Sequence, residues 1–81
     1  MTVRVLFFAK ARDLAGAPST ELTLEGDATV ADLRRTLGKA IPALQPILPR
    51  LHVAINNDYA ADSDPIPAGA EIACFPPVSG G

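Results

Sequence analysis

The chain has only one cysteine, Cys74, and one histidine, His52, among its 81 residues. A single cysteine cannot form an internal disulfide, and it cannot supply the thiolate set of a zinc ribbon or an iron–sulfur cluster. Neither a cysteine–histidine pair nor a serine triad can be placed in the sequence. We therefore expect no metal site, no catalytic nucleophile and a reducing compartment.

Basic clusters and long apolar runs are also missing. The net charge is −2 and the few basic residues are dispersed, which argues against a nucleic-acid or anionic-membrane partner. The apolar run from Val5 to Ala9 is shorter than the core of a secretory signal, and no segment approaches the ~20 residues that span a bilayer. We expect a cytoplasmic protein with protein partners.

The composition is that of one small folded domain, with 48% hydrophobic and 20% charged residues. A chain this short sustains one core, so a private catalytic cleft is not expected. Residues 2–9 predict a central strand covered on both faces, with Val3, Val5 and Phe7 on one of them. A short helical turn is expected over residues 10–14. A second strand is expected over residues 19–25, with one side exposed to solvent, and it would pair with the first strand.

The clearest helix begins at Thr29, where Thr29 and Asp32 have capping-box spacing. Its apolar stripe consists of Val30, Leu33, Leu37 and Ile41, its wet face of Asp32, Arg34, Arg35 and Lys39, and Pro42 ends it. An irregular stretch over 42–50 precedes strands at 51–55, 59–60 and 70–75, with a loop at 62–69.

This order predicts an α+β fold of the ubiquitin-like β-grasp type. The mixed sheet would have four to five strands, with one main helix packed on one face. A ferredoxin-like sandwich would require two comparable helices, and only one is convincing. We expect a domain over residues 1–75 and an extended C-terminal Gly-Gly tail over 76–81.

The tail is built to stand clear of the domain. Pro76 and Pro77 cannot donate to a sheet and hold the chain extended. Only Val78, Ser79, Gly80 and Gly81 follow, and glycines let a backbone enter a narrow channel. Residues 76–81 would reach on the order of 20 Å, so a partner's active site could admit them.

An aromatic residue, Phe75, stands at the root of this tail. By strand alternation it points opposite to Ile72 and Cys74, and it could anchor a partner. Leu6, Phe8 and Tyr59 could extend it into an exposed apolar patch, although a second mini-core under a loop would explain them as well. His52, by the same alternation, lies on a solvated face.

The sequence resembles the small subunit of molybdopterin synthase over essentially its whole length. The resemblance is carried by Val5-Leu-Phe-Phe-Ala9 with Arg12 and Gly16, the helix start at Thr29-Val30, Ala54-Ile-Asn56, and above all Phe75-Pro-Pro-Val-Ser-Gly-Gly81. It implies a ubiquitin-like β-grasp fold and a sulfur-carrier role in molybdenum cofactor biosynthesis.

The chemistry implied by this resemblance takes place on Gly81. A ubiquitin-activating-type adenylyltransferase would consume ATP to form an acyl-adenylate on its carboxylate, and sulfur from a donor protein would displace AMP to leave a thiocarboxylate. The tail would then enter the large subunit of the synthase, where cyclic pyranopterin monophosphate receives the sulfur and two deliveries complete the dithiolene. No stably bound cofactor is implied for the carrier, and the expected assembly is a heterotetramer around a dimeric large subunit.

The resemblance also implies that Phe75 and Tyr59 lie at both partner interfaces and that Arg12 touches the adenylating enzyme, although an exposed salt bridge would also explain Arg12. Three other functions stay open. A thiamine-pathway sulfur carrier would serve a thiazole synthase, a ubiquitin-like modifier would be conjugated to lysines, and a non-covalent β-grasp adaptor would tolerate a residue appended after Gly81.

Overall fold

The main helix begins at the capping residues expected from the sequence. In the computed structural model, which describes residues 1–77, α2 spans Val30–Ala40 with Thr29 as its N-cap. The Asp32 backbone N–H donates to the Thr29 hydroxyl, and the Thr29 N–H donates to the Asp32 carboxylate at 2.9 Å, so the predicted capping box is confirmed. The Thr29 N–H, with further help from the Thr29 hydroxyl and Arg35, lowers the pKa of Asp32.

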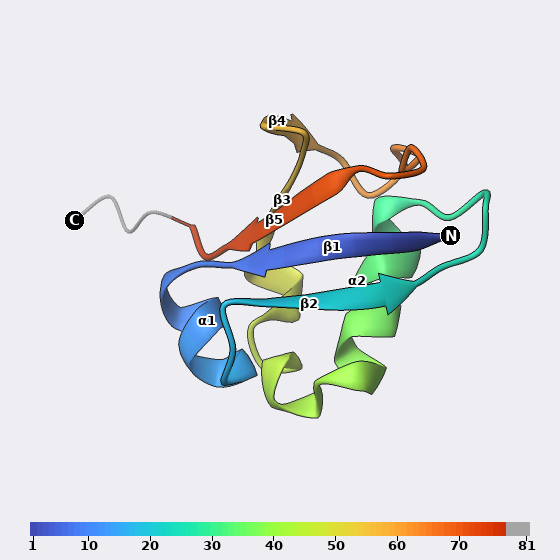
Figure 1. Ribbon diagram of the computed structural model, residues 1–81. Coiled ribbons are helices and arrows are strands. Elements are labelled where there is room, and N and C mark those ends of the chain that lie inside the picture. Colours follow the sequence, from blue (N-terminus) through green and yellow to red (C-terminus); the bar gives the residue numbers. More distant parts are fainter. Residues whose placement is uncertain (78–81) are drawn as a thin grey trace.

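The sheet contains five strands in the order β2-β1-β5-β3-β4 (Figure 1). The strands are β1 Thr2–Phe7, β2 Ser19–Thr23, β3 His52–Ile55, β4 Asp58–Ala60 and β5 Glu71–Phe75. β1 pairs antiparallel with β2 and parallel with β5, and β3 pairs antiparallel with β5 and β4. This mixed sheet with α2 across one face confirms the predicted β-grasp architecture.

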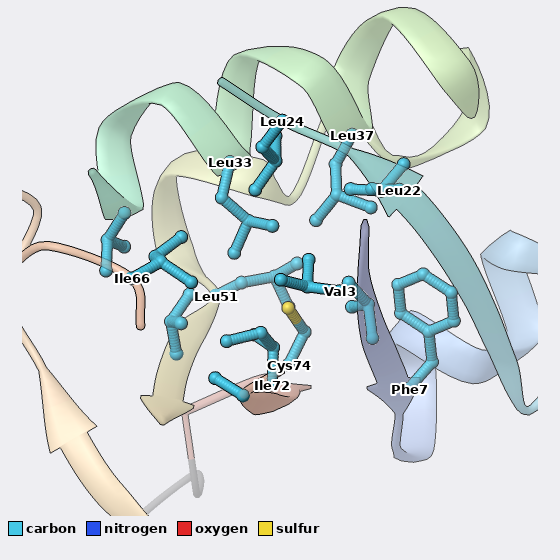
Figure 2. Close-up of a cluster of buried hydrophobic side chains, with 14 of the residues drawn as sticks. Val3, Phe7, Leu22, Leu24, Leu33, Leu37, Leu51, Ile66, Ile72 and Cys74 are labelled. Carbon is cyan, nitrogen blue, oxygen red and sulfur yellow. The ribbon is translucent and has the colours of Figure 1, made fainter. Parts of the chain in front are cut away.

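The core lies between α2 and the inner face of the sheet. Figure 2 shows Leu33 and Leu37 of α2 directed toward the sheet, where Val3, Ile72 and Cys74 are buried. Val5 and Phe7 of β1 are also buried, as strand alternation predicted. The prediction that this strand is covered on both faces was wrong, because Thr2 and Arg4 are exposed and Leu6 is only half-buried. One helical layer covers one face of a sheet, and the other face remains open.

Two segments are more helical than predicted. Residues 10–14 fall within α1, Ala9–Ala15, which Gly16 ends in a left-handed conformation (φ 72°). The stretch after α2, predicted to be irregular, forms the short 3-10 helices η1, Pro42–Leu44, and η2, Leu48–Arg50, each of which carries a proline in its first turn. None of the helices in the described part of the chain has the length and apolar character required to cross a bilayer.

Arg34 also departs from its predicted place on the wet face of α2. Its side chain is only 20% exposed, its Nε lies 2.8 Å from the Asp62 carboxylate, and its Nη1 donates to the Leu48 carbonyl. The guanidinium therefore joins α2 to η2 and to the loop before β5. Arg35, in contrast, remains 70% exposed and pairs with Asp32.

Candidate functional site: the root of the C-terminal tail

The strand that leads into the tail occupies the middle of the sheet. β5 is hydrogen-bonded to β1 on one side and to β3 on the other, and the Phe8 N–H donates to the Cys74 carbonyl at 3.1 Å. β5 is therefore held on both sides up to its last residues. Pro76 and Pro77 follow it directly at one end of the sheet (Figure 1). Val78, Ser79, Gly80 and Gly81 lie outside the described residues, so their predicted insertion into a partner channel stays a prediction.

Three aromatic rings meet on the open face of the sheet at this end. The ring centroids of Phe75 and Tyr59 are 5.6 Å apart, and those of Phe75 and His52 are 5.7 Å apart. His52 meets Tyr59 edge-on, with centroids separated by 5.9 Å. Phe75 is half-buried among its neighbours, whereas Tyr59 is 75% exposed. The contact between Phe75 and Tyr59 supports the predicted apolar patch.

From its place in the strand alternation, His52 is expected only to lie on a solvated face, and the structure confirms that it is exposed. Its place beside Phe75 depends on the antiparallel register of β3 and β5, in which the two residues are direct partners. Because this register pairs residues far apart in the chain, no local sequence pattern predicts it. Strand alternation predicts only that both side chains lie on the open face. To predict that His52 and Phe75 are neighbours, the two strands would have to be aligned as an antiparallel pair.

Small residues continue this surface across the sheet. The registers place Leu6 of β1 beside Ala73 of β5, Ala73 beside Ala54 of β3, and Ala54 beside Tyr59 of β4. The registers therefore line up apolar side chains on the open face, with Ala73 partly exposed and Ala54 only 7% exposed between larger neighbours. We define the docking face as the following residues: Leu6, Phe8, His52, Ala54, Tyr59, Ala73 and Phe75.

Two tight turns position the outer members of the docking face. Asn56 and Asn57 both have positive φ, 48° and 75°, which forms the two-residue hairpin turn that sets Tyr59 opposite Ala54. Asn56 is also tied to β5, because its N–H donates to the Glu71 carbonyl at 2.9 Å and its side-chain oxygen accepts from the Glu71 N–H. On the other side, the chain turns at Ala9 (φ 52°) directly after Phe8, which is 48% exposed.

Two strongly exposed aromatic side chains on a domain of this size indicate an interaction surface. Phe8 and Tyr59 are the two large hydrophobic side chains that remain exposed within residues 1–77. On a small protein, aromatic side chains grouped around an apolar strip are typical of a protein–protein contact, where a few such residues supply most of the binding free energy. The docking face therefore fits a partner that also receives the tail.

Arg12, predicted to touch an adenylating enzyme, lies on α1 at the same end of the sheet as the tail root. Within the described part of the chain its guanidinium forms no ion pair, so no exposed salt bridge explains it there. Arg12 is exposed. Its contact with a partner stays a prediction.

Cys74 is not a reactive group, although it is only one residue from Phe75. Its side chain is fully buried against the core, and burial raises the pKa of the thiol to about 12. A thiolate is the reactive form of cysteine, so Cys74 should be inert at neutral pH. The sequence-based interpretation of Cys74 as a small core residue is confirmed.

This burial gives a direct test. We expect a thiol-reactive disulfide reagent to leave Cys74 unlabelled in the folded protein from pH 7 to pH 9, since protection comes from both burial and the raised pKa. The same reagent should label one thiol per chain in urea. Rapid labelling of the folded protein, with its circular dichroism unchanged, would contradict the buried position.

No enzyme-like centre is found elsewhere among residues 1–77. No group of three or more His, Cys, Asp or Glu side chains in this range could hold a metal ion. A wide hollow of about 660 Å³ lies at the opposite end, between β2 and α2, and includes Asp32 and Arg35. Those two residues are engaged in the capping box and an ion pair.

Known proteins resemble this chain over its full length. The ThiS family model matches residues 5–81. The molybdopterin synthase sulfur carrier subunit of Chlamydomonas reinhardtii is 35% identical, with complete coverage of both chains. Among solved structures, SAMP1 from Haloferax volcanii superposes with a TM-score of 0.90 at 34% identity, again with complete coverage of both chains.

Two further structures extend the comparison. A complex of subunits 1 and 2 of the molybdopterin-converting factor from Helicobacter pylori contains a chain that matches with a TM-score of 0.73 at 26% identity, with both chains fully covered. A Caldiarchaeum subterraneum ubiquitin matches with a TM-score of 0.67 at 15% identity over 100% of this chain and 98% of its own, which supports the fold alone. The resemblance predicted from the sequence is confirmed: the chain belongs to the ThiS family, together with the sulfur carrier subunits of molybdopterin synthase.

Proposed function

We propose that this chain is the sulfur-carrier subunit of a molybdopterin synthase, with Gly81 as the residue that bears the sulfur. The observation that carries the proposal is the continuity of the docking face with the tail: Phe75 belongs to the aromatic cluster, and Pro76 starts the tail. Full-length relatives named molybdopterin synthase sulfur carrier subunits support the same role. The chain would act as one subunit of a sulfurtransferase and would not be catalytic alone.

The proposed chemistry starts from a carboxylate, which is a poor electrophile. An adenylating partner would join the Gly81 carboxylate to AMP and release pyrophosphate from ATP. A sulfide equivalent from a donor protein would attack the acyl carbon, and AMP would leave to give the thiocarboxylate. In the large subunit, this sulfur would bond to a carbon of cyclic pyranopterin monophosphate as the C–O bond at that carbon breaks and its oxygen group leaves. Water would then hydrolyse the thioester between Gly81 and the substrate, so that the sulfur stays on the product and Gly81 is released as a carboxylate. Two such cycles would complete the dithiolene.

The division of labour follows from what the domain contains. Within residues 1–77 the docking face would supply recognition, and no group of three or more His, Cys, Asp or Glu side chains could hold a metal ion. The acid–base groups and the substrate pocket would therefore belong to the partners. A solved complex of two molybdopterin-converting factor subunits in a relative supports a large-subunit partner. ATP use by the adenylating partner fits the cytoplasmic location expected from the sequence.

The identity of the sulfur acceptor separates this function from its nearest alternative, a sulfur carrier of the thiamine pathway. Thiocarboxylated protein would be mixed with a molybdopterin synthase large subunit and its pterin substrate, and separately with a thiazole synthase and its substrates. Sulfur appearing in the pterin product supports the proposal. Sulfur appearing only in the thiazole product would assign the chain to the thiamine pathway and overturn it.

A second candidate function, protein modification, is favoured by one observation. A structure of H. volcanii small archaeal modifier protein 1 superposes with a TM-score of 0.87, and a curated protein of that name is 37% identical over 91% of this chain and 94% of its own. In that role a target lysine would attack the activated Gly81 and form an isopeptide bond. A ladder of covalent conjugates in the source cell, lost on deletion of Gly81, would support it.

A further inference from the structure

Positive charge gathers at the end of the domain from which the tail leaves. β1 and β5 run parallel, so α1, which follows β1, lies at the same end as Pro76 (Figure 1). This places Lys10 near the tail root, and η2 brings Arg50 to the same place. The chain as a whole is acidic, with net charge −2, so this local excess of cations runs against the average.

Lys10 and Arg50 flank a small hollow beside the two prolines. The hollow has a volume of about 180 Å³, and its apolar wall is formed by Ile47, Leu51, Pro76 and Pro77. Both cations are exposed. Among residues 1–77, no carboxylate lies within ion-pair distance of either one, although Asp13 shares α1 with Lys10. We call this feature the root cleft.

Any partner that encloses the tail must also cover the root cleft, because Pro76 and Pro77 form part of its wall. Covering two cations without a counter-charge is unfavourable, since each one loses its hydration and gains nothing in return. A carboxylate placed between them would restore the balance and would form charge-assisted hydrogen bonds to the guanidinium. The apolar wall would at the same time accept the methylene groups of that acidic side chain.

We propose that the root cleft receives an Asp or Glu side chain of the large subunit, at the mouth of the channel that admits the tail. This inference rests on the proposed function and specifies the chemistry of the partner surface. Lys10 and Arg50 act as positioning residues: they fix the root of the tail against the partner, and thereby the depth to which Gly81 enters.

The test compares two double variants with equal loss of charge. Lys10→Gln with Arg50→Gln neutralises the root cleft, whereas Lys39→Gln with Arg35→Gln neutralises two exposed cations on α2 that line the hollow at the opposite end. Binding of each protein to the cognate large subunit would be measured by calorimetry at low and high ionic strength. We expect the root-cleft variant to bind about 10-fold more weakly at low salt, with a smaller difference at high salt, and the α2 variant to bind within about 2-fold of wild type.

Equal weakening by both double variants would overturn the inference, because it would indicate a general charge effect. Unchanged binding by the root-cleft variant would also overturn it, provided that the wild-type chain binds. Weakening that appears only when the pterin phosphate is present would assign the two cations to the substrate and overturn the partner carboxylate. If the wild-type chain does not bind the large subunit at all, the proposed function fails first. Circular dichroism would verify that all variants are folded.

Discussion

Deletion of Gly81 is expected to reduce sulfur transfer to background while leaving thermal unfolding nearly unchanged. The reason is the separation between the core and the proposed reactive residue. The buried cluster is assembled from residues between Val3 and Cys74, all within the domain that precedes the tail. The sulfur, in contrast, would be carried by the carboxyl group of Gly81 alone. Sulfur transfer would be measured as the sulfur-containing pterin product that forms when each protein, after incubation with the adenylating partner and sulfur donor, is mixed with the large subunit and its substrate. Thermal stability would be measured by a calorimetric scan.

Two matched proteins sharpen this experiment. An alanine appended after Gly81 should be as inactive as the deletion, because it moves the carboxylate to a residue with a side chain and beyond its proposed position in the partner. Gly26→Ala provides the glycine control, since a Cβ at Gly26 would meet no atom within 4 Å and its φ is not positive. It should transfer sulfur like wild type. Normal function of the appended variant in the cell would contradict the carrier role and favour a non-covalent adaptor, which does not need a free Gly81 carboxylate.

Phe75→Ala is expected to weaken binding to the large subunit by about 30-fold, or about 2 kcal/mol. Phe75 belongs to the aromatic cluster, where its ring lies beside those of both His52 and Tyr59, and it adjoins the start of the tail. The substitution removes the Phe75 ring from the interface, and it also removes the ring against which His52 and Tyr59 pack. Calorimetric titration of the two subunits measures the change directly.

Tyr59 supplies the matched comparison for this second prediction. Tyr59→Ala should weaken binding to a similar degree, because the ring is 75% exposed and available to a partner. Tyr59→Phe keeps the ring, so it should bind within a few-fold of wild type. A full loss of affinity in Tyr59→Phe would show that the hydroxyl, and not the apolar surface, makes the contact. Unchanged affinity in Phe75→Ala would contradict the assignment of the docking face.

Local sequence signals predicted the elements that depend on neighbours in the chain. The capping box at Thr29 and Asp32, the apolar stripe of α2 and the alternation in β1 are set by contacts a few residues apart, and the structure reproduces them. The pairing of β1 with β2 joins strands that are consecutive in the sequence, with only residues 8–18, including α1, between them. The terminal motif carried the family resemblance because it extends well beyond two glycines.

Features that depend on distant pairing were not predicted. The grouping of Phe75 with Tyr59 was predicted, but the place of His52 beside them requires the register of β3 against β5, and the root cleft requires α1 and η2 to meet beside Pro76. Arg34 was expected in water because its helix position is polar, but Asp62 and the Leu48 carbonyl come to it from other parts of the chain. The nearly continuous apolar character of residues 2–9 predicts two covered faces, whereas Thr2 and Arg4 on the second face of β1 are exposed and Leu6 belongs to the docking face. Periodicity shows that a face is apolar, and it does not show whether the core or a partner covers it.

The central claim, that Gly81 carries sulfur, is tested most directly by fragment-resolved mass spectrometry of the C-terminal peptide. The protein would be incubated with ATP, an adenylating partner and a sulfur donor, and fragments would distinguish the change at Gly81 from oxidation of Met1 or Cys74. Replacement of one oxygen by sulfur at Gly81 is the predicted result. An unmodified Gly81, with the same partner active on a known carrier, would contradict the account.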